Sequence, residues 1–375
     1  RPRTPTAARE ALERRWRERI VATPALAELV TGASLADEPY HRWLRYKQAY
    51  APKLVRVFLA RAVGLEADEA PLLDPFAGAG TLPIECARRG LAAIGVEALD
   101  ALVFLANARH ATACPDPPRL DGCVTWEQFA ARLHEPIHQA ALICARARQY
   151  DRDGRPLAHP RPLAELFRRV WAEIVADCRR PLAARVDVRQ GDARVLADVP
   201  DASVGGVLTS PPYLSRHDYT RVTRPHEQTH AFWYEATPIG KRRAAQVPAH
   251  PAASPRQRTQ EMPPAVAEIC EAYAIEGAFR LADVVRSYFD DMFQSLRSAA
   301  RVLRAGRPLW LVVGGARLRG VYIPADLILA EYAAEAGFEV LGVRHARDLI
   351  RGGRRLGAIE RVTPREVVIV MRRRR

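Results

Sequence analysis

Lysine is almost absent from this chain of 375 residues and occurs only at Lys47, Lys53 and Lys241. Arginine therefore supplies nearly all of the positive charge, a skew that a GC-rich genome can also produce. Codon composition does not by itself explain a formal net charge of +14, because that value is an excess over the acidic residues. An excess of this size favours a polyanionic partner, so the sequence predicts binding to nucleic acid.

Long apolar runs and patterned cysteines are missing as well. No run of 18 or more apolar residues occurs, so we expect no segment that spans a membrane. Residues 1–9 are basic and lack an apolar core, which argues against a secretory signal. The six cysteines stand singly, without a CxxC pair. This predicts reduced thiols in a cytoplasmic protein and no metal site.

Two short motifs each follow an apolar, strand-like run. Residues 74–81 read Asp-Pro-Phe-Ala-Gly-Ala-Gly-Thr, and residues 210–213 read Ser-Pro-Pro-Tyr. Glycines let the first loop turn tightly and approach a ligand. The two prolines fix φ and lack an N–H, so the second loop is stiff and its carbonyls are available as acceptors. A stiff edge of carbonyls beside an aromatic ring suits a planar base with an exocyclic amine.

In this order, and at strand ends, the two loops resemble motifs I and IV of the amino-methyltransferases. These enzymes move a methyl group from S-adenosylmethionine to an exocyclic nitrogen. The resemblance covers residues 41–110 and 190–222 well, and the C-terminal strands loosely. It implies the α/β fold of class I methyltransferases, a Rossmann-like, seven-stranded mixed sheet with a helical insertion.

The resemblance places the motif I residues against S-adenosylmethionine as the cofactor. Asp74 would take its ammonium group, and Phe76 would pack against its methionine portion. Gly78 and Gly80 would let the backbone approach the ligand, and the helix that begins at Thr81 would present free N–H groups.

Further cofactor contacts are expected on either side of this loop. Glu97 follows the next strand, about 20 residues past the glycines, and is placed to accept both ribose hydroxyls, with a helix N-cap as the alternative. By resemblance Asp192 binds the adenine amino group, and ordinary turn chemistry is its alternative. Residues 41–55 resemble motif X or form an aromatic helix packed on the core. As motif X they would bring three residues near the carboxylate end of the ligand: Tyr46, Lys47 and Pro52.

The second loop is the expected catalytic site. An amine lone pair that is delocalised into a base must be localised before it attacks a methyl group. The Ser210 hydroxyl and the Pro211 carbonyl would accept the amine hydrogens, and Pro212 would keep the loop stiff. Tyr213 would stack on a base extruded from the duplex. The alternative is a plain strand-ending turn.

The resemblance also bears on the target. Serine as the first motif IV residue is commoner among cytosine-N4 enzymes, so we expect transfer to cytosine N4 in duplex DNA. Adenine-N6 methylation of DNA and methylation of an RNA base amine are the alternatives, since motif I here precedes motif IV, unlike the best-known cytosine-N4 enzymes. Arg216 and Arg221 would suit phosphates, and a cognate restriction endonuclease is a candidate partner.

Periodicity divides the chain into four parts. Residues 1–40 are expected to form an N-terminal helical cap, with amphipathic helical spacing over 9–30. Residues 41–110 and 185–375 carry the α/β pattern of the catalytic domain. Residues 111–184 predict a helical insertion, and residues 222–264, rich in Pro, His and Arg, predict a target-recognition loop. We expect base specificity in these last two segments.

Overall fold

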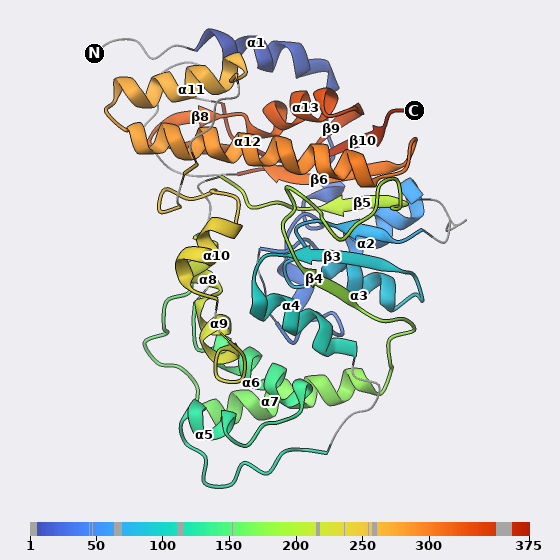
Figure 1. Ribbon diagram of the computed structural model, residues 1–375, viewed down its shortest axis with the longest axis vertical. Coiled ribbons are helices and arrows are strands. Elements are labelled where there is room, and N and C mark those ends of the chain that lie inside the picture. The colour runs from blue at the N-terminus through green and yellow to red at the C-terminus, as the bar shows by residue number, and fades with distance from the viewer. Residues whose placement is uncertain are drawn as a thin grey trace.

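A single eight-stranded sheet forms the centre of the molecule, in the order β1-β9-β10-β6-β5-β2-β3-β4 (Figure 1). In the computed structural model the described residues are 6–44, 46, 48–63, 70–110, 116–151, 153–214, 218–235, 237–253, 255–256, 261–349 and 362–375. Strand β10 runs antiparallel to both of its neighbours, and all other pairs in the sheet are parallel. The strands are β1 (Ile20–Ala22), β2 (Leu72–Asp74), β3 (Ala93–Glu97), β4 (Asp187–Gln190), β5 (Gly206–Thr209), β6 (Pro308–Gly314), β9 (Phe338–Asp348) and β10 (Arg365–Arg373).

This mixed sheet is the Rossmann-like α/β fold of the class I methyltransferases, as the sequence predicts. It has eight strands where seven are expected, because β1 adds to the edge strand β9 through the pair Ile20 and Val343. The helix expected over residues 9–30 is wrong beyond Trp16, where α1 (Ala7–Trp16) ends. Ile20 and Val21 are β-branched and lie beside an open sheet edge, so pairing with β9 overrides the helical spacing.

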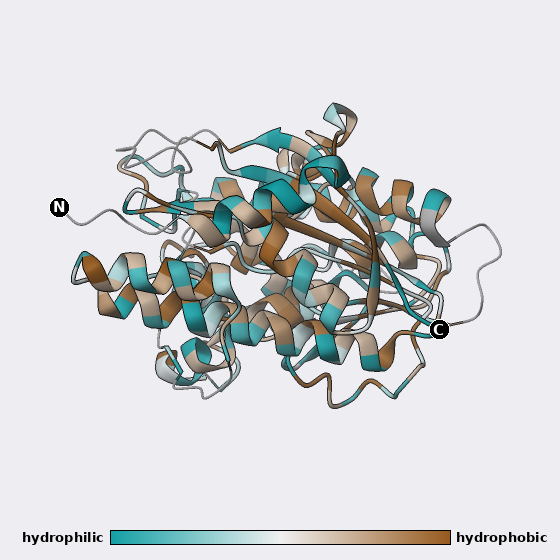
Figure 2. Cartoon of the chain, turned by 90° about the horizontal axis from the view of Figure 1, so that it is seen from above, coloured by the Kyte–Doolittle hydropathy of each residue, from teal (hydrophilic) through white to brown (hydrophobic). Residues whose placement is uncertain are grey.

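Both faces of the sheet are covered by helices, because successive side chains of a strand point to opposite faces. In β6, Leu311 and Val313 join a core with α11 (Pro264–Ile275), α12 (Phe279–Val302) and α13 (Ala325–Glu335). Trp310 and Val312 join a core on the other face with α2 (Pro52–Phe58) and α3 (Thr81–Ala87). Figure 2 shows hydrophobic strands running through the centre between helices of mixed character.

A second group of helices extends from the β4 edge, at the bottom of Figure 1. It contains α5 (Trp126–Ala130), α6 (Pro136–Ala147) and α7 (Leu163–Cys178), which share a core with α4 (Asp100–Asn107) and with Val188 of β4. The loop expected over residues 222–264 is in fact partly helical. It contains α9 (Arg224–His230), which packs against α6 and α4, and α10 (Ile239–Ala245).

Two smaller features complete the fold. Strands β7 (Ala316–Leu318) and β8 (Val321–Ile323) form a separate antiparallel hairpin that the sequence pattern does not reveal. Across the described residues, no helix is long and apolar enough to cross a membrane.

Candidate active site

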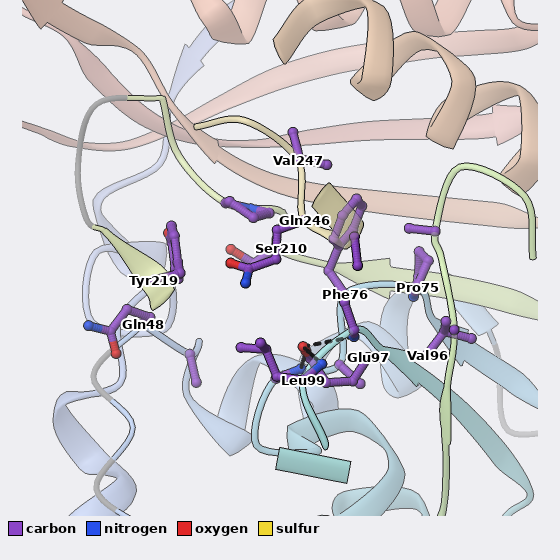
Figure 3. Close-up of a pocket in the computed structure, with 18 of the residues that line it drawn as sticks. Gln48, Pro75, Phe76, Val96, Glu97, Leu99, Ser210, Tyr219, Gln246 and Val247 are labelled. Atoms are coloured by element: carbon purple, nitrogen blue, oxygen red, sulfur yellow. Dashed lines mark hydrogen bonds between the residues drawn. The ribbon is translucent and has the colours of Figure 1, made fainter. Parts of the chain in front are cut away.

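One pocket lies at the carboxyl ends of β2, β3, β4 and β5 (Figure 3). Strand order reverses between β2 and β5, and ligands of open α/β sheets bind at such a switch point. Segments from both sequence motifs meet here, although about 130 residues separate them along the chain. Of the residues predicted from sequence, the pocket brings together Tyr46, Phe76, Gly78, Thr81, Glu97, Asp192, Ser210 and Pro212.

The motif I loop depends on its glycines for shape. Gly78 has φ +53° and Gly80 has φ +84°, both in the left-handed region that side chains rarely adopt. A Cβ on Gly80 would also come within 3.0 Å of the Ala106 Cβ, and one on Gly78 within 3.3 Å of the Tyr46 ring. The loop therefore lies closely against α4 on one side and Tyr46 on the other. Gly80 supports the pocket without lining it.

Asp74 anchors this loop from behind. Its Oδ2 accepts the Tyr50 hydroxyl at 2.7 Å, and its Oδ1 accepts the Phe76 amide at 3.0 Å and the Thr209 hydroxyl at 2.6 Å. Burial raises the pKa of Asp74 to about 6, against the lowering effect of these hydrogen bonds. Asp74 is not among the described residues that line the pocket. Its observed contacts are therefore those of a structural anchor.

Glu97 lies in the pocket wall opposite Ser210. Its carboxylate accepts backbone N–H groups of Gly78 at 2.8 Å, Ala98 at 2.9 Å and Leu99 at 3.0 Å. Burial raises its pKa to about 7, while these three hydrogen bonds lower it. A carboxylate has about four lone-pair sites, so one acceptor position remains for a ligand hydroxyl. Glu97 thus connects the glycine loop to the end of β3.

Asp192 lines the pocket next to β4 and is paired with Arg194. The Arg194 Nε lies 2.8 Å and 3.0 Å from the two carboxylate oxygens of Asp192. The same guanidinium donates to Asp291 of α12 at 2.7 Å. The orientation of Asp192 is therefore set by an ion-pair network that reaches the buried Asp291, as well as by its turn.

Two residues of the Ser-Pro-Pro-Tyr loop line the pocket, and the other two are buried. Ser210 and Pro212 line the pocket, whereas Pro211 and Tyr213 are buried. The Tyr213 ring packs over Gly314, where an added Cβ would lie 3.0 Å from its Cδ2. The Tyr213 amide donates to the Tyr219 hydroxyl at 3.2 Å. Tyr219 lines the pocket, whereas Tyr213 is not among the described residues that do.

The sequence reasoning missed several pocket residues. Tyr219 lies in the stretch that continues motif IV, and Gln48 and Tyr50 lie in the segment that resembles motif X. Their closeness to these motifs in the sequence could have identified them as pocket residues. Gln246 and Val247 had no such signal, because only the tertiary fold brings them here. Figure 3 shows both on the side of the pocket near Ser210.

The remaining predicted residues lie away from this pocket or outside the described part of the chain. Pro52 is buried at the first position of α2. Arg221 is exposed, and its Nε donates to the Asp153 carbonyl at 3.0 Å, which ties α8 (Tyr219–Val222) to the insertion. Lys47 and Arg216 are outside the described residues. Within the described ranges, no three His, Cys, Asp or Glu side chains are grouped to hold a metal ion.

No family model matches the chain. Among curated proteins, it is similar to the Type II methyltransferase M.AvaI of Nostoc sp. (strain PCC 7120). The two are 22% identical over 436 aligned residues, which cover 88% of this chain and 86% of that protein.

Solved methyltransferase structures are also similar to this chain. A Methanosarcina mazei S-adenosylmethionine-dependent methyltransferase is 12% identical with a TM-score of 0.35, over 83% of this chain and 94% of that one. A Thermus thermophilus protein described as a DNA modification methylase is 19% identical with a TM-score of 0.24, over 49% of this chain and 51% of that one. The strand order of the sheet carries the fold assignment: the chain has the fold of S-adenosylmethionine-dependent methyltransferases.

Proposed function

We propose that this chain transfers a methyl group from S-adenosylmethionine to the exocyclic N4 of cytosine in duplex DNA. The observation that carries the proposal is that Ser210 shares one pocket with Phe76 and Glu97. The amine-accepting loop and the glycine loop therefore face a common space. The Type II methyltransferase name of the curated relative supports a DNA substrate.

The pocket residues suit the parts of S-adenosylmethionine. Gly78 and Tyr46 both line the pocket, and the absence of a Cβ on Gly78 lets the Tyr46 ring lie close to it. Glu97 and Asp192 offer carboxylates for hydroxyl and amino groups, and Phe76 offers an apolar ring to the methionine portion. The cofactor supplies an electrophilic methyl group on a sulfonium.

Catalysis by the chain would consist of positioning and of accepting hydrogen bonds. The Ser210 Oγ and the Pro211 carbonyl would accept the two amine hydrogens and draw the nitrogen toward a tetrahedral geometry. Transfer would form a nitrogen–carbon bond and break the sulfur–carbon bond of the cofactor, and the methylated amine would release one proton to solvent. In-line positioning of this kind can supply about 7–11 kcal/mol of the barrier reduction.

Serine at position 210 favours cytosine N4 over adenine N6 or an RNA base amine as the target. We assign base recognition to residues 111–184 and 222–264. In this proposal an endonuclease of the same site specificity is a candidate partner.

Mass spectrometry of nucleosides tests the target. Duplex DNA and structured RNA are incubated separately with the protein and methyl-labelled cofactor, and Ser210→Ala is the matched control. We expect labelled N4-methylcytosine from DNA with the wild-type protein and far less with the variant. N6-methyladenine, 5-methylcytosine or label in RNA alone would contradict the assignment.

Salt dependence of binding tests the polyanionic partner independently. Phosphate contacts release counterions, so DNA affinity should fall by orders of magnitude between low and moderate salt. A flat response, or tighter binding to structured RNA than to duplex DNA, would favour the RNA alternative.

A further inference from the structure

A basic segment closes one side of the cofactor pocket. It consists of α10 and the two residues that follow it, and we call residues 239–247 the strap. Helix α10 carries Lys241 and Arg243, and directly afterwards the chain enters the pocket wall. The strap residues that line the pocket are Ala245, Gln246 and Val247. One short segment therefore holds Lys241, Arg243 and a wall of the cofactor site.

Arg194 fastens the strap to the pocket. Its guanidinium Nη2 lies 3.3 Å from the Ala245 carbonyl and 3.5 Å from the Ala244 carbonyl, at the C-terminal end of α10. The same Nη2 lies 2.5 Å from Asp192, and Nη1 lies 2.7 Å from Asp291. The Arg194 side chain is only 10% exposed. A single buried cation thus joins a pocket-lining carboxylate, the strap and the buried face of α12.

Other contacts hold the inner side of the strap. Arg256 donates to the Ala244 carbonyl and is paired with Asp291. Arg242 pairs with Glu227 of α9 at 3.1 Å, and Glu227 in turn accepts the Ala101 amide of α4 at 3.2 Å. The strap is therefore connected to the sheet layer through Arg194 and to the helical insertion through α9.

Lys241 and Arg243 carry the remaining positive charge of the strap and point to different sides of α10, because residues two positions apart do not share a helix face. Lys241 is exposed and Arg243 is half-buried, whereas Arg242 turns inward to Glu227. With a net charge of +14 on the chain, these two side chains suit phosphate groups. The Gln246 amide donates to the Arg242 carbonyl at 3.2 Å, so a pocket-lining side chain is bonded to the backbone that bears these cations.

We propose that the strap couples nucleic acid binding to cofactor binding, with Arg194 as the positioning residue. This inference rests on the proposed function. Phosphates held by Lys241 and Arg243 stabilise the strap in its position over the pocket and so retain the cofactor. By linkage, cofactor in the pocket raises DNA affinity by the same factor.

The test measures the affinity of the protein for cofactor and for DNA, each in the absence and in the presence of the other ligand. S-adenosylhomocysteine is the probe because it is not consumed, and a mixed-sequence DNA duplex is the second ligand. We expect each to tighten the other by the same factor of about fivefold or more. In the double variant Lys241→Gln/Arg243→Gln, the coupling factor between the two ligands should fall to near one. The slope of log DNA affinity against log salt concentration should decrease in magnitude by about two. Affinity for S-adenosylhomocysteine alone should stay within about twofold of wild type, as expected for residues outside the pocket wall.

A matched double variant separates local contact from general charge. Lys53 and Arg297 are exposed on α2 and α12 and do not line the pocket. Lys53→Gln/Arg297→Gln removes the same charge and should keep the wild-type coupling factor. Equal loss of coupling in the two double variants would overturn the assignment to the strap.

Arg194→Lys tests the connection itself. Lysine keeps the charge but cannot span Asp192 and the two α10 carbonyls with a planar fork. We expect coupling to be lost, while DNA affinity without S-adenosylhomocysteine stays within about twofold of wild type. Full coupling in this variant would overturn the role of Arg194. If both ligands bind wild type but their affinities are independent, the strap inference fails and the proposed function stands. If S-adenosylhomocysteine does not bind at all, the proposed function fails first.

Discussion

The Thr209 hydroxyl donates a 2.6 Å hydrogen bond to Asp74 Oδ1 and so joins the last residues of two neighbouring parallel strands. Each strand enters its motif loop at the next residue, Pro75 after Asp74 and Ser210 after Thr209. The same carboxylate also accepts the Phe76 amide. One buried group thereby fixes both loops, and the distance between the two motif loops depends on it.

Thr209→Val should destabilise the protein more than an ordinary buried Thr→Val change. It removes a charge-assisted hydrogen bond from the buried Asp74 carboxylate, and hydrogen bonds to charged groups are worth about 1.5–3 kcal/mol. Thr223→Val is the matched control, because it removes only a neutral hydrogen bond, and the Tyr219 carbonyl keeps the Thr223 amide as a donor. Urea unfolding of the three proteins measures the effect. Equal losses for the two variants would contradict the role of the Thr209–Asp74 bond.

Asp74→Asn should change how stability depends on pH. Burial raises the pKa of Asp74 to about 6 from 3.8. Between these values the folded protein keeps a proton that the unfolded chain has lost, so wild-type stability falls as pH rises, by about 3 kcal/mol for this group. Asparagine does not titrate, so the stability of the variant does not include this decrease with rising pH. The difference in unfolding free energy should therefore shift in favour of the variant from pH 4 to pH 7, and a constant difference would contradict the burial argument.

The sequence predicted the elements around the two motifs well and the pocket only in part. Turn residues and apolar runs are local signals, so the strand before the first motif, the helix start at Thr81 and the strand before Glu97 were predicted where β2, α3 and β3 lie. β1 was missed because the helical spacing is a local signal, whereas β1 forms by pairing with β9, a strand far away in the sequence. Gln246 reaches the pocket through the packing of α10, which no local pattern encodes. Asp74 was correctly placed at the end of its strand, but burial and three hydrogen bonds determine what it contacts.

Gly95→Ala should be strongly destabilising although its φ is ordinary. An added Cβ would lie 2.8 Å from the Ala77 Cβ and 2.9 Å from a Val188 methyl group. Overpacking of this kind typically costs about 1–3 kcal/mol, and here it pushes against Ala77 in the pocket wall. Gly240→Ala in α10 is the control, because nothing lies within 4 Å of its Cβ position. We expect a lower midpoint in urea for Gly95→Ala alone; similar midpoints would argue against tight β3–loop packing.

Glu97→Gln should weaken S-adenosylhomocysteine binding about tenfold or more. The carboxylate accepts three backbone N–H groups, and an amide must turn its NH₂ toward at least one of them. Loss of a charge-assisted contact is worth about 1.5–3 kcal/mol. Calorimetry measures the affinity, with the exposed Glu127→Gln as the control for a lost carboxylate. Unchanged affinity in Glu97→Gln would remove this residue from the cofactor site.

Ser210 and Tyr213 stand in the same tetrapeptide, but their substitution should affect different properties. Ser210 lines the pocket, so Ser210→Ala should lower kcat with little change in KM or in thermal midpoint, because its hydrogen bond matters most as the nitrogen changes geometry. Tyr213 is 8% exposed and packs in the core over Gly314, so Tyr213→Ala should lower the thermal midpoint markedly, with about 3–5 kcal/mol lost for a buried aromatic ring.

Tyr213→Phe completes this comparison, because it keeps the ring and its packing. We expect its thermal midpoint to lie much closer to wild type than that of the alanine variant, with methyl-transfer activity largely retained. If Tyr213→Ala instead kept the wild-type midpoint and lost only DNA affinity, its ring would be a base-stacking surface, as the motif resemblance implies. Full activity of Ser210→Ala would exclude its hydroxyl from the reaction, whatever Tyr213 does.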